Sequence, residues 1–125
     1  MYGDQLRVKR ELFGFAAVWH HGVELPGGQV AENGPFYGTR ISDLASFAKG
    51  GVVEVVAHDM TMAQREAAVE RARSRVGEHA YDALGWNCEH FATWCVTGAP
   101  VSSQLLEWVA RLAEAALAAA KPPAS

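Results

Sequence analysis

The pattern of apolar residues changes once along this chain, near residue 60. Before that point, short alternating or apolar segments are separated by turns rich in glycine and proline, which is typical of β-strands. The predicted strands cover residues 5–11, 15–25, 29–32 and 52–57, the last of them buried. After residue 60, apolar residues recur at helical spacing. Strands followed by helices predict an α+β fold, in which a small antiparallel sheet packs against helices.

Capping residues delimit the predicted helices. Thr61 and Gln64 have the spacing of a capping box, so a helix begins there, and its apolar stripe is expected to reach Val76, with Gly77 as the stop. Asn87 is a good N-cap for another helix. The other predicted segments are helices at 41–49 (capped by Ser42), 87–98 and 102–120, a loop at 81–86 and a frayed tail at 121–125.

Length and charge exclude several classes of protein. At 125 residues, the chain has the size of one domain. Its formal net charge of −3 lacks the basic excess of nucleic-acid-binding proteins, so no nucleic-acid partner is expected. No apolar run reaches the ~20 residues that span a bilayer. The charged first eleven residues lack the apolar core of a signal peptide, so a cytoplasmic location is expected.

One short block, Asn87-Cys88-Glu89-His90-Phe91, carries the chemistry. With Asn87 as N-cap, Cys88 lies in the first helical turn, where unpaired backbone N–H groups and the positive end of the helix dipole face the thiolate. We expect this position to lower the pKa of the thiol from about 8.5 toward neutrality and to make Cys88 a nucleophile. His90 lies two residues further along the helix and is expected to make a structural hydrogen bond.

A nucleophilic cysteine needs a base and a third group that orients the base. His20 and His21 lie in a predicted strand, so their side chains point to opposite faces and only one of them can face Cys88. Glu32 and Asn33 end the next strand, where a carboxylate can be a cross-strand neighbour of a histidine. The expected set is His20, Glu32 and Cys88. His21 is the alternative base, and Asn33 replaces Glu32 after a one-residue slip of register.

The other histidines and the second cysteine do not indicate a metal site. Five histidines and two cysteines occur, but none has a paired spacing such as Cys-x-x-Cys or His-x-x-x-His, so neither zinc nor another cofactor is expected. Cys95 is seven residues from Cys88, too far along one helix for a disulfide, and is expected in the core. His58 and His79 are expected at the surface.

Four blocks of sequence occur in an order that resembles a known family. They are Gly3-Asp4-Gln5-Leu6, His20-His21-Gly22-Val23, Ala72-Arg73-Ser74-Arg75-Val76-Gly77 and Asn87-Cys88-Glu89-His90-Phe91-Ala92-Thr93-Trp94-Cys95. Together they resemble the lecithin:retinol acyltransferase-like family, which includes small phospholipase/acyltransferases. The Asn-Cys-Glu-His-Phe block is highly specific, and the resemblance covers residues 3–100. It implies a circularly permuted papain-like, NlpC-like fold with the nucleophilic cysteine at a helix N-terminus.

The resemblance also implies roles for particular residues. Family members use the motif cysteine as nucleophile and the first histidine of the strand motif as its base, which implies Cys88 and His20. The third position, often histidine in relatives, falls on Glu32, whose carboxylate can accept a ring N–H and favour the imidazolium. Where this chain has Glu24, the family usually has a tyrosine that is thought to help the oxyanion site. A glutamate there is expected to oppose a developing oxyanion.

The implied activity is thiol-dependent acyl transfer. Family members take an acyl chain from a phospholipid as a thioester and pass it to an amine, an alcohol, a lysolipid or water. We therefore expect a cysteine phospholipase A or acyltransferase domain at residues 1–100, followed by an amphipathic helix and tail at residues 101–125. Two alternatives stay open: a cysteine amidase or peptidase, such as a toxin-like effector, and a degenerate member that only binds lipid or a partner.

The final predicted helix has an apolar stripe interspersed with charged residues. Its apolar residues are Leu105, Trp108, Val109, Leu112, Ala116 and Leu117, and its charged residues are Glu107, Arg111 and Glu114. Docking on the domain or self-association into a homo-oligomer is one interpretation of this stripe. Peripheral contact with a membrane is the other, although few basic residues are present to attract anionic lipid.

Overall fold

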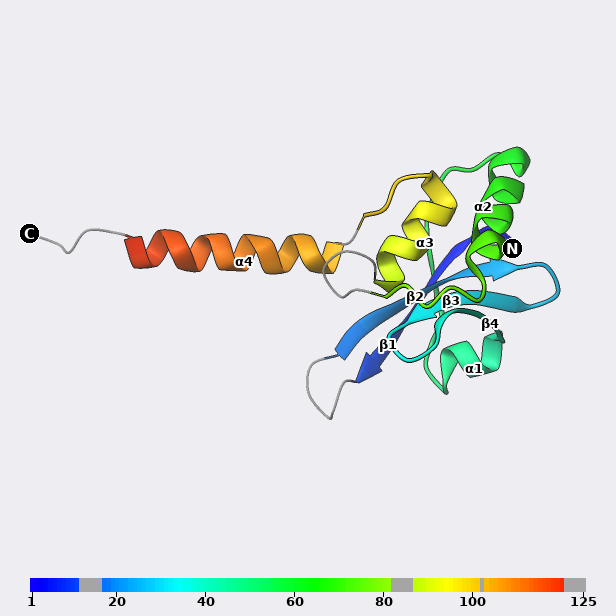
Figure 1. The fold of residues 1–125 in the computed structure, drawn as a ribbon, viewed down its shortest axis with the longest axis horizontal. Coiled ribbons are helices and arrows are strands. Elements are labelled where there is room, and N and C mark those ends of the chain that lie inside the picture. The colour runs from blue at the N-terminus through cyan, green and yellow to red at the C-terminus, as the bar shows by residue number, and fades with distance from the viewer. Residues whose placement is uncertain (12–16, 82–86, 102, 121–125) are drawn as a thin grey trace, which may run out of the picture.

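The computed structural model of the protein describes residues 1–11, 17–81, 87–101 and 103–120. The centre of the fold is a five-stranded antiparallel sheet with the strand order β4-β3-β2-β1-β5 (Figure 1). The strands are β1 Gln5–Glu11, β2 Ala17–Leu25, β3 Gln29–Gly34, β4 Gly38–Asp43 and β5 Glu54–Val56. The helices are α1 Leu44–Ala48, α2 Met62–Arg75, α3 Cys88–Thr97 and α4 Ser103–Ala120. The predicted α+β class is confirmed.

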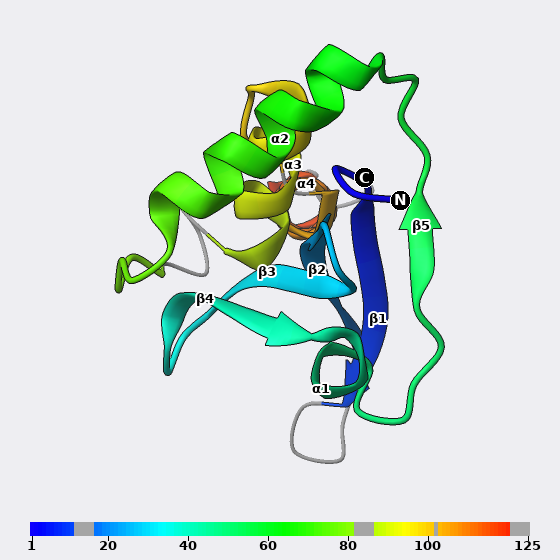
Figure 2. The ribbon, with the colours of Figure 1, turned by 90° about the vertical axis from the view of Figure 1, so that its right-hand side faces the viewer.

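Two apolar clusters hold helices against opposite faces of the sheet. On one face, Val23 and Ala31 pack with the buried residues of α2 and α3. On the other face, Val8 and Val30 pack against Phe47 of α1. Figure 2 shows α2 and α3 above the sheet and α1 below it. Because side chains alternate along a strand, neighbouring residues of β2 face different helices.

Gly22 allows α1 to approach the sheet closely. A Cβ atom at this position would lie 2.7 Å from the Val30 side chain and 2.8 Å from the Phe47 ring. Such a glycine marks a close approach of another element to a strand. Phe47 is fully buried, and its ring centroid lies 5.2 Å from that of His20. The aromatic ring of α1 therefore supports the first histidine of the pair.

The predicted helix caps of α2 and α3 are confirmed. The Thr61 side chain accepts the Gln64 backbone N–H, and the Gln64 side chain accepts that of Thr61, which completes the capping box of α2. Asn87 is the N-cap of α3, and this helix ends at Gly98 in the left-handed conformation, with φ of 81°. The buried stripe of α2 does not reach Val76, which is 40% exposed.

The segment after β3 differs most from the prediction. Residues 38–43 form β4, which pairs with β3 along its whole length, where a helix was expected from residue 41. The helix α1 is therefore only five residues long. Its N-cap is Asp43 and not Ser42, because the Asp43 carboxylate accepts the backbone N–H of Ser46.

The strand predicted as buried at 52–57 is instead a short edge strand. β5 has three residues and pairs with β1 at the end of the sheet. Val52 and Val55 are 80% and 57% exposed, so the valine-rich sequence does not mark a core strand. Parts of the predicted strand at 15–25 and loop at 81–86, and the tail at 121–125, lie outside the described residues.

The predicted C-terminal helix is confirmed as α4, which extends away from the rest of the protein in Figure 1. Its side chains are described from Val109 onwards. Val109, Leu112 and Leu117 are 55%, 71% and 71% exposed. Within the described part of the chain, no helix is both long enough and apolar enough to cross a bilayer.

Candidate active site

Cys88 is the first residue of α3 and lies against the edge of β2. Among the described strands, β3 pairs with β2 only from Gly22 onwards, so the preceding backbone of β2 is open on that side. The Cys88 thiol lies beside this open stretch of β2 backbone. Its Sγ atom lies 3.8 Å from the carbonyl oxygen of Trp19, and the backbone N–H of His21 hydrogen-bonds to it. The backbone on both sides of His20 therefore holds the thiol.

Asn87 organises the beginning of α3 around the thiol. Its side-chain oxygen accepts the backbone N–H groups of Glu89 and His90, both at 3.0 Å. In return, the Asn87 backbone N–H donates to Nδ1 of His90 at 3.1 Å. His90 therefore makes the structural hydrogen bond predicted for it. The Cys88 backbone N–H is directed at its own thiol and not at the capping side chain of Asn87.

The pKa of Cys88 is raised, which is opposite to the prediction from its place at a helix N-terminus. Burial is the largest cause, because it disfavours the charged thiolate. Hydrogen bonds from the backbone N–H groups of His21, Glu89 and Cys88 itself lower the pKa, but they do not outweigh burial. At neutral pH the group is therefore a neutral thiol, and it needs a base to become a nucleophile.

His20 and Glu32 contact each other on the face of the sheet that α1 covers. His20 Nε2 lies 3.3 Å from Glu32 Oε2, and Glu32 is only 2% exposed. Glu32 is paired with Gly22, which makes it a diagonal neighbour of His20 across the two strands. The bond to Glu32 occupies Nε2. Among the described residues, nothing hydrogen-bonds to Nδ1 of His20, so this nitrogen can accept a proton.

Arg40 and Tyr37 complete the surroundings of Glu32, and the sequence reasoning missed both. Arg40 is opposite Glu32 in the β3–β4 pair, and its Nε and Nη2 atoms donate to Oε1 at 3.0 and 2.9 Å. The Tyr37 hydroxyl also donates to Glu32, and the Arg40 guanidinium lies 3.5 Å above the Tyr37 ring. Burial alone would raise the pKa of Glu32, but the bonds and charges of His20 and Arg40 lower it to about 2.

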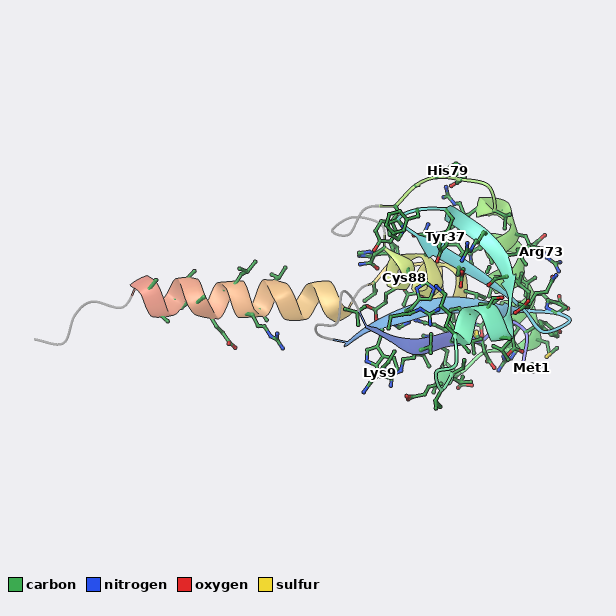
Figure 3. All side chains as sticks on the ribbon, turned by 90° about the horizontal axis from the view of Figure 1, so that it is seen from below. Met1, Lys9, Tyr37, Arg73, His79 and Cys88 are labelled. Carbon is green, nitrogen blue, oxygen red and sulfur yellow. The ribbon has the colours of Figure 1, made fainter. Side chains whose placement is uncertain are left out.

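Two tyrosines lie within electrostatic range of the thiol. Burial, followed by the Glu32 carboxylate, raises the pKa of Tyr37 to about 12, and Cys88 contributes to the increase. Burial and Cys88 also raise the pKa of Tyr81. Figure 3 shows Cys88 at the start of α3, with Tyr37 labelled close to it in that view. Both hydroxyls therefore stay protonated at neutral pH.

His21 points to the other face of the sheet, toward α3, and both of its ring nitrogens face polar partners. The Gln5 side-chain nitrogen lies 3.0 Å from Nδ1, and Glu89 Oε2 lies 3.7 Å from Nε2. Burial lowers the pKa of His21 to about 4, so the ring is neutral at neutral pH. Gln5 also bonds to His58 at 2.7 Å through its side-chain oxygen. His58 is therefore a half-buried network residue and not the surface residue predicted, whereas His79 is exposed.

Two other residues singled out in the sequence have polar partners of their own. Glu24 is four residues beyond His20, about 13 Å along an extended strand. Its carboxylate pairs with the amino group of Met1 at 2.8 Å. Asn33, the alternative to Glu32, faces the other layer and donates to Thr39 Oγ1 at 3.1 Å.

Cys95 is fully buried in the core between the sheet, α2 and α3, as predicted. Its carbonyl oxygen accepts a hydrogen bond from Arg71, and burial raises the pKa of its thiol to about 12. Across the described residues, no three histidine, cysteine, aspartate or glutamate side chains gather closely enough to hold a metal ion.

Comparisons with known proteins match the part of the chain that includes α3. A sequence model of the family described as lecithin retinol acyltransferase matches residues 36–101, more than half of the chain. Over 69 residues, the chain is 35% identical to lecithin retinol acyltransferase of Rattus norvegicus, a match that covers 52% of this chain and 30% of that protein. The chain thus matches less than a third of the relative's length. The family match contains Arg40 and Cys88 and begins after His20 and Glu32. This chain belongs to the lecithin retinol acyltransferase family.

Proposed function

We propose that this chain is a phospholipase A or acyltransferase that forms an S-acyl intermediate on Cys88. His20 acts as the base, Glu32 orients it, and a phospholipid is the acyl donor. The observation that carries the proposal is the position of the thiol against the backbone of residues 19 and 21. Residues 19 and 21 flank His20 in the chain, and Nε2 of His20 is already bonded to a buried carboxylate, which supports His20 as the partner of the thiol. We also propose the permuted papain-like arrangement for the fold.

The first step acylates the cysteine. Sγ attacks the ester carbonyl carbon while the thiol proton passes to Nδ1 of His20, so a C–S bond forms and negative charge develops on the carbonyl oxygen. The ester C–O bond then breaks, and the leaving lysophospholipid oxygen takes the proton from His20. A thioester on Cys88 remains. Because burial raises the pKa of the thiol, its proton moves during the attack and not before it.

The second step transfers the acyl chain and restores the thiol. Water, an alcohol, an amine or a lysolipid attacks the thioester carbonyl while His20 takes its proton. The C–S bond breaks, and the proton on His20 returns to the sulfur of Cys88. With water as the acceptor the enzyme is a phospholipase, and with another acceptor it is an acyltransferase.

Backbone groups are the proposed donors to the oxyanion. The N–H groups of His21 and Cys88 both point at Sγ in the free protein. In this proposal they donate to the carbonyl oxygen once Sγ has bonded to the carbonyl carbon. Donors that are already oriented stabilise such a charge without rearranging. The family's usual tyrosine at the position of Glu24 is therefore not needed in this chain.

The choice of His20 over His21 follows from Nδ1 of His20, to which no group in the described part of the chain hydrogen-bonds. Nδ1 of His20 has a lone pair that can accept the thiol proton, and Nε2 donates to Glu32. In His21, Nδ1 is bonded to Gln5 and Nε2 faces Glu89. His21 has to give up a buried partner before it can accept a proton, and His20 does not.

A phospholipid donor implies contact with a lipid surface, and we propose that α4 makes this contact. Its exposed Leu112 and Leu117 supply apolar area, and its charged residues are Glu107, Arg111 and Glu114. The protein is expected to co-sediment with phosphatidylcholine vesicles, and the double variant Leu112→Ser/Leu117→Ser to co-sediment several-fold less. Equal sedimentation of both proteins contradicts the contact, and a concentration-dependent mass would instead indicate self-association through α4.

Mass spectrometry tests the proposed reaction. After incubation with phosphatidylcholine, the intact mass should increase by one acyl group located on Cys88, and lysophospholipid should appear. The variant Cys88→Ala should show neither product, whereas the control Cys95→Ala should show both if it remains folded. A folded protein with no adduct and no lipid turnover contradicts the lipid hypothesis. Cleavage of amide substrates without lipid turnover assigns an amidase.

A further inference from the structure

Two basic side chains of β1 gather over Trp19, the residue whose carbonyl oxygen faces the thiol. Lys9 is paired with Trp19 in the strand register. Arg7 is paired with His21, so it shares the face of the sheet that α3 covers. The guanidinium carbon of Arg7 lies 4.1 Å from the centre of the Trp19 ring, and the Lys9 amino group lies 5.3 Å from it. We call Arg7, Lys9 and Trp19 the β1–β2 basic patch.

The positive charge of the β1–β2 basic patch is only partly neutralised by the side chains that the structure describes. Arg7 pairs with Glu54 at 3.4 Å, but the two side chains are 37% and 45% exposed, so solvent weakens the pair. Lys9 is exposed, and no carboxylate among the described residues lies within ion-pair distance of it. One glutamate therefore opposes two cations.

The guanidinium of Arg7 also has a hydrogen-bond donor to spare. Its Nε–H is buried, and no described group accepts it. Buried donors in native proteins nearly always have a partner, so the missing acceptor indicates a ligand or an ion. Phosphate suits this position, because its oxygens accept several guanidinium N–H groups at once.

The β1–β2 basic patch lies beside the proposed nucleophile. The carbonyl oxygen of Trp19 is 3.8 Å from Sγ of Cys88, and Lys9 is one strand further away. Figure 3 shows Lys9 and Cys88 at the same end of the sheet. Cys88 also begins α3, and the partial positive charge of a helix N-terminus adds to the attraction for an anion. An ester that reaches Sγ therefore carries its neighbouring groups toward Arg7 and Lys9.

We propose that Arg7 and Lys9 bind the phosphate of the acyl donor and select phospholipids with an anionic headgroup, such as phosphatidylglycerol, over phosphatidylcholine. This inference rests on the proposed function and names the substrate class of that same site. The phosphate and the acyl esters of a phospholipid share one glycerol, so an ester at Sγ brings the phosphate close to the β1–β2 basic patch. The quaternary ammonium of choline is repelled by both cations. Choline is usually bound by aromatic rings, but the Trp19 ring already holds two cations.

Binding of soluble short-chain lipids to the variant Cys88→Ala tests the inference without turnover. Followed by NMR titration below the micelle concentration, dihexanoyl phosphatidylglycerol should bind about tenfold more tightly than dihexanoyl phosphatidylcholine, the effect of one charged hydrogen bond. Arg7→Met and Lys9→Met, each added to Cys88→Ala, should remove most of this difference. Lys9 is exposed, so its substitution keeps the test decisive if Arg7→Met does not fold. Arg73→Met, at an exposed cation of α2, is the matched control and should change neither affinity.

Turnover gives a second measurement in the protein that retains Cys88. The ratio of kcat/KM for phosphatidylglycerol to that for phosphatidylcholine should fall about tenfold in Lys9→Met, mainly through KM, because the phosphate is held before and during the reaction. Arg73→Met should keep the original ratio.

Three results separate the possible explanations. If both lipids bind equally to folded Cys88→Ala, or if Arg7→Met and Lys9→Met behave like Arg73→Met, the inference is wrong and the two cations only pack on Trp19. If inorganic phosphate binds as tightly as the anionic lipid, the β1–β2 basic patch is a site for free anions, which also overturns the inference. Selective binding of the anionic lipid without an acyl adduct on Cys88 in the original protein refutes the proposed reaction alone.

Discussion

His20 and His21 are neighbours in one strand, but their surroundings differ in a way that decides what each can do. His20 lies on the α1 side, bonded to Glu32 through one nitrogen, with nothing described at the other. His21 lies on the α3 side, where Gln5 and Glu89 face both nitrogens. Among the described residues, one nitrogen of the first ring has no hydrogen-bond partner, whereas the second ring is held in one neutral form.

The difference shows how one strand can serve a site and its support together. The alternation of β2 sends consecutive side chains to opposite layers. His20 then meets the carboxylate of the hairpin partner, and His21 anchors the beginning of α3 through Glu89. The backbone of the same residues holds the thiol. We expect substitutions of His20 to affect the reaction, and substitutions of the His21 network to affect stability first.

The largest effect should come from exchanging each histidine in turn. His20→Gln removes the proposed base and should lower kcat/KM for phospholipid by about 10²–10⁴-fold, the usual contribution of a positioned base. His21→Gln keeps an amide that can bond to Gln5 and should lower it by about tenfold or less. Steady-state kinetics on folded proteins compares them. A greater loss in His21→Gln would make His21 the base.

Acid should destabilise the two networks in separate pH ranges. The pKa of His21 is lowered from 6.5 to about 4, so the unfolded chain takes up this proton first and stability falls as the pH decreases from 6.5 to 4. The pKa of Glu32 is lowered from 4.5 to about 2, so its contribution is present above pH 4.5 and is lost between 4.5 and 2.

Urea unfolding between pH 7 and 3 measures this difference, with the free energy of unfolding obtained at each pH. His21→Gln should flatten the upper part of the pH dependence and leave the lower part. Glu32→Gln should do the reverse. If the free energy of unfolding of His21→Gln depends on pH in the same way as that of the original protein, His21 is not held neutral by the fold.

Truncation of Gln5 should show how much the His21 network contributes to stability. Gln5 is 1% exposed and bonds to both His21 and His58, so Gln5→Ala leaves two ring nitrogens without these partners. An unsatisfied buried polar group costs roughly 1–3 kcal/mol, and urea unfolding should show a loss of that order. Gln29→Ala, at an exposed glutamine of β3, is the matched control and should change little. If Gln5→Ala is as stable as Gln29→Ala, the bonds of Gln5 to His21 and His58 do not contribute to stability.

Local rules predicted the parts of the site that depend on nearby residues. The cap at Asn87 follows from its residue type and the capping box at Thr61 from its spacing to Gln64, and the structure contains both. His20 and Glu32 flank a short hairpin, whose turn fixes the register that brings them together. Arg40 was missed because the segment containing it was predicted in part as a helix, and only its pairing with β3 places it opposite Glu32.

Burial explains the other differences from the sequence analysis. The helix N-terminus favours a thiolate at Cys88, but the amount of surface that β2 and its neighbours cover is a property of the whole fold. For the same reason, the valines of β5 could not be placed at an exposed edge, nor His58 inside a network, from periodicity alone. Spacing gives the direction of a side chain, and packing decides what surrounds it.

The smallest expected effect concerns Tyr37, which adds a neutral donor to the cluster that Arg40 charges. Tyr37→Phe removes the hydroxyl bond to Glu32 and keeps the ring under the guanidinium, so the unfolding free energy should fall by about 0.5–1.5 kcal/mol. Tyr81→Phe, at the other tyrosine near the thiol, is the comparison. If Tyr37→Phe is as stable as the original protein, the hydroxyl bond to Glu32 makes no net contribution to the free energy of unfolding.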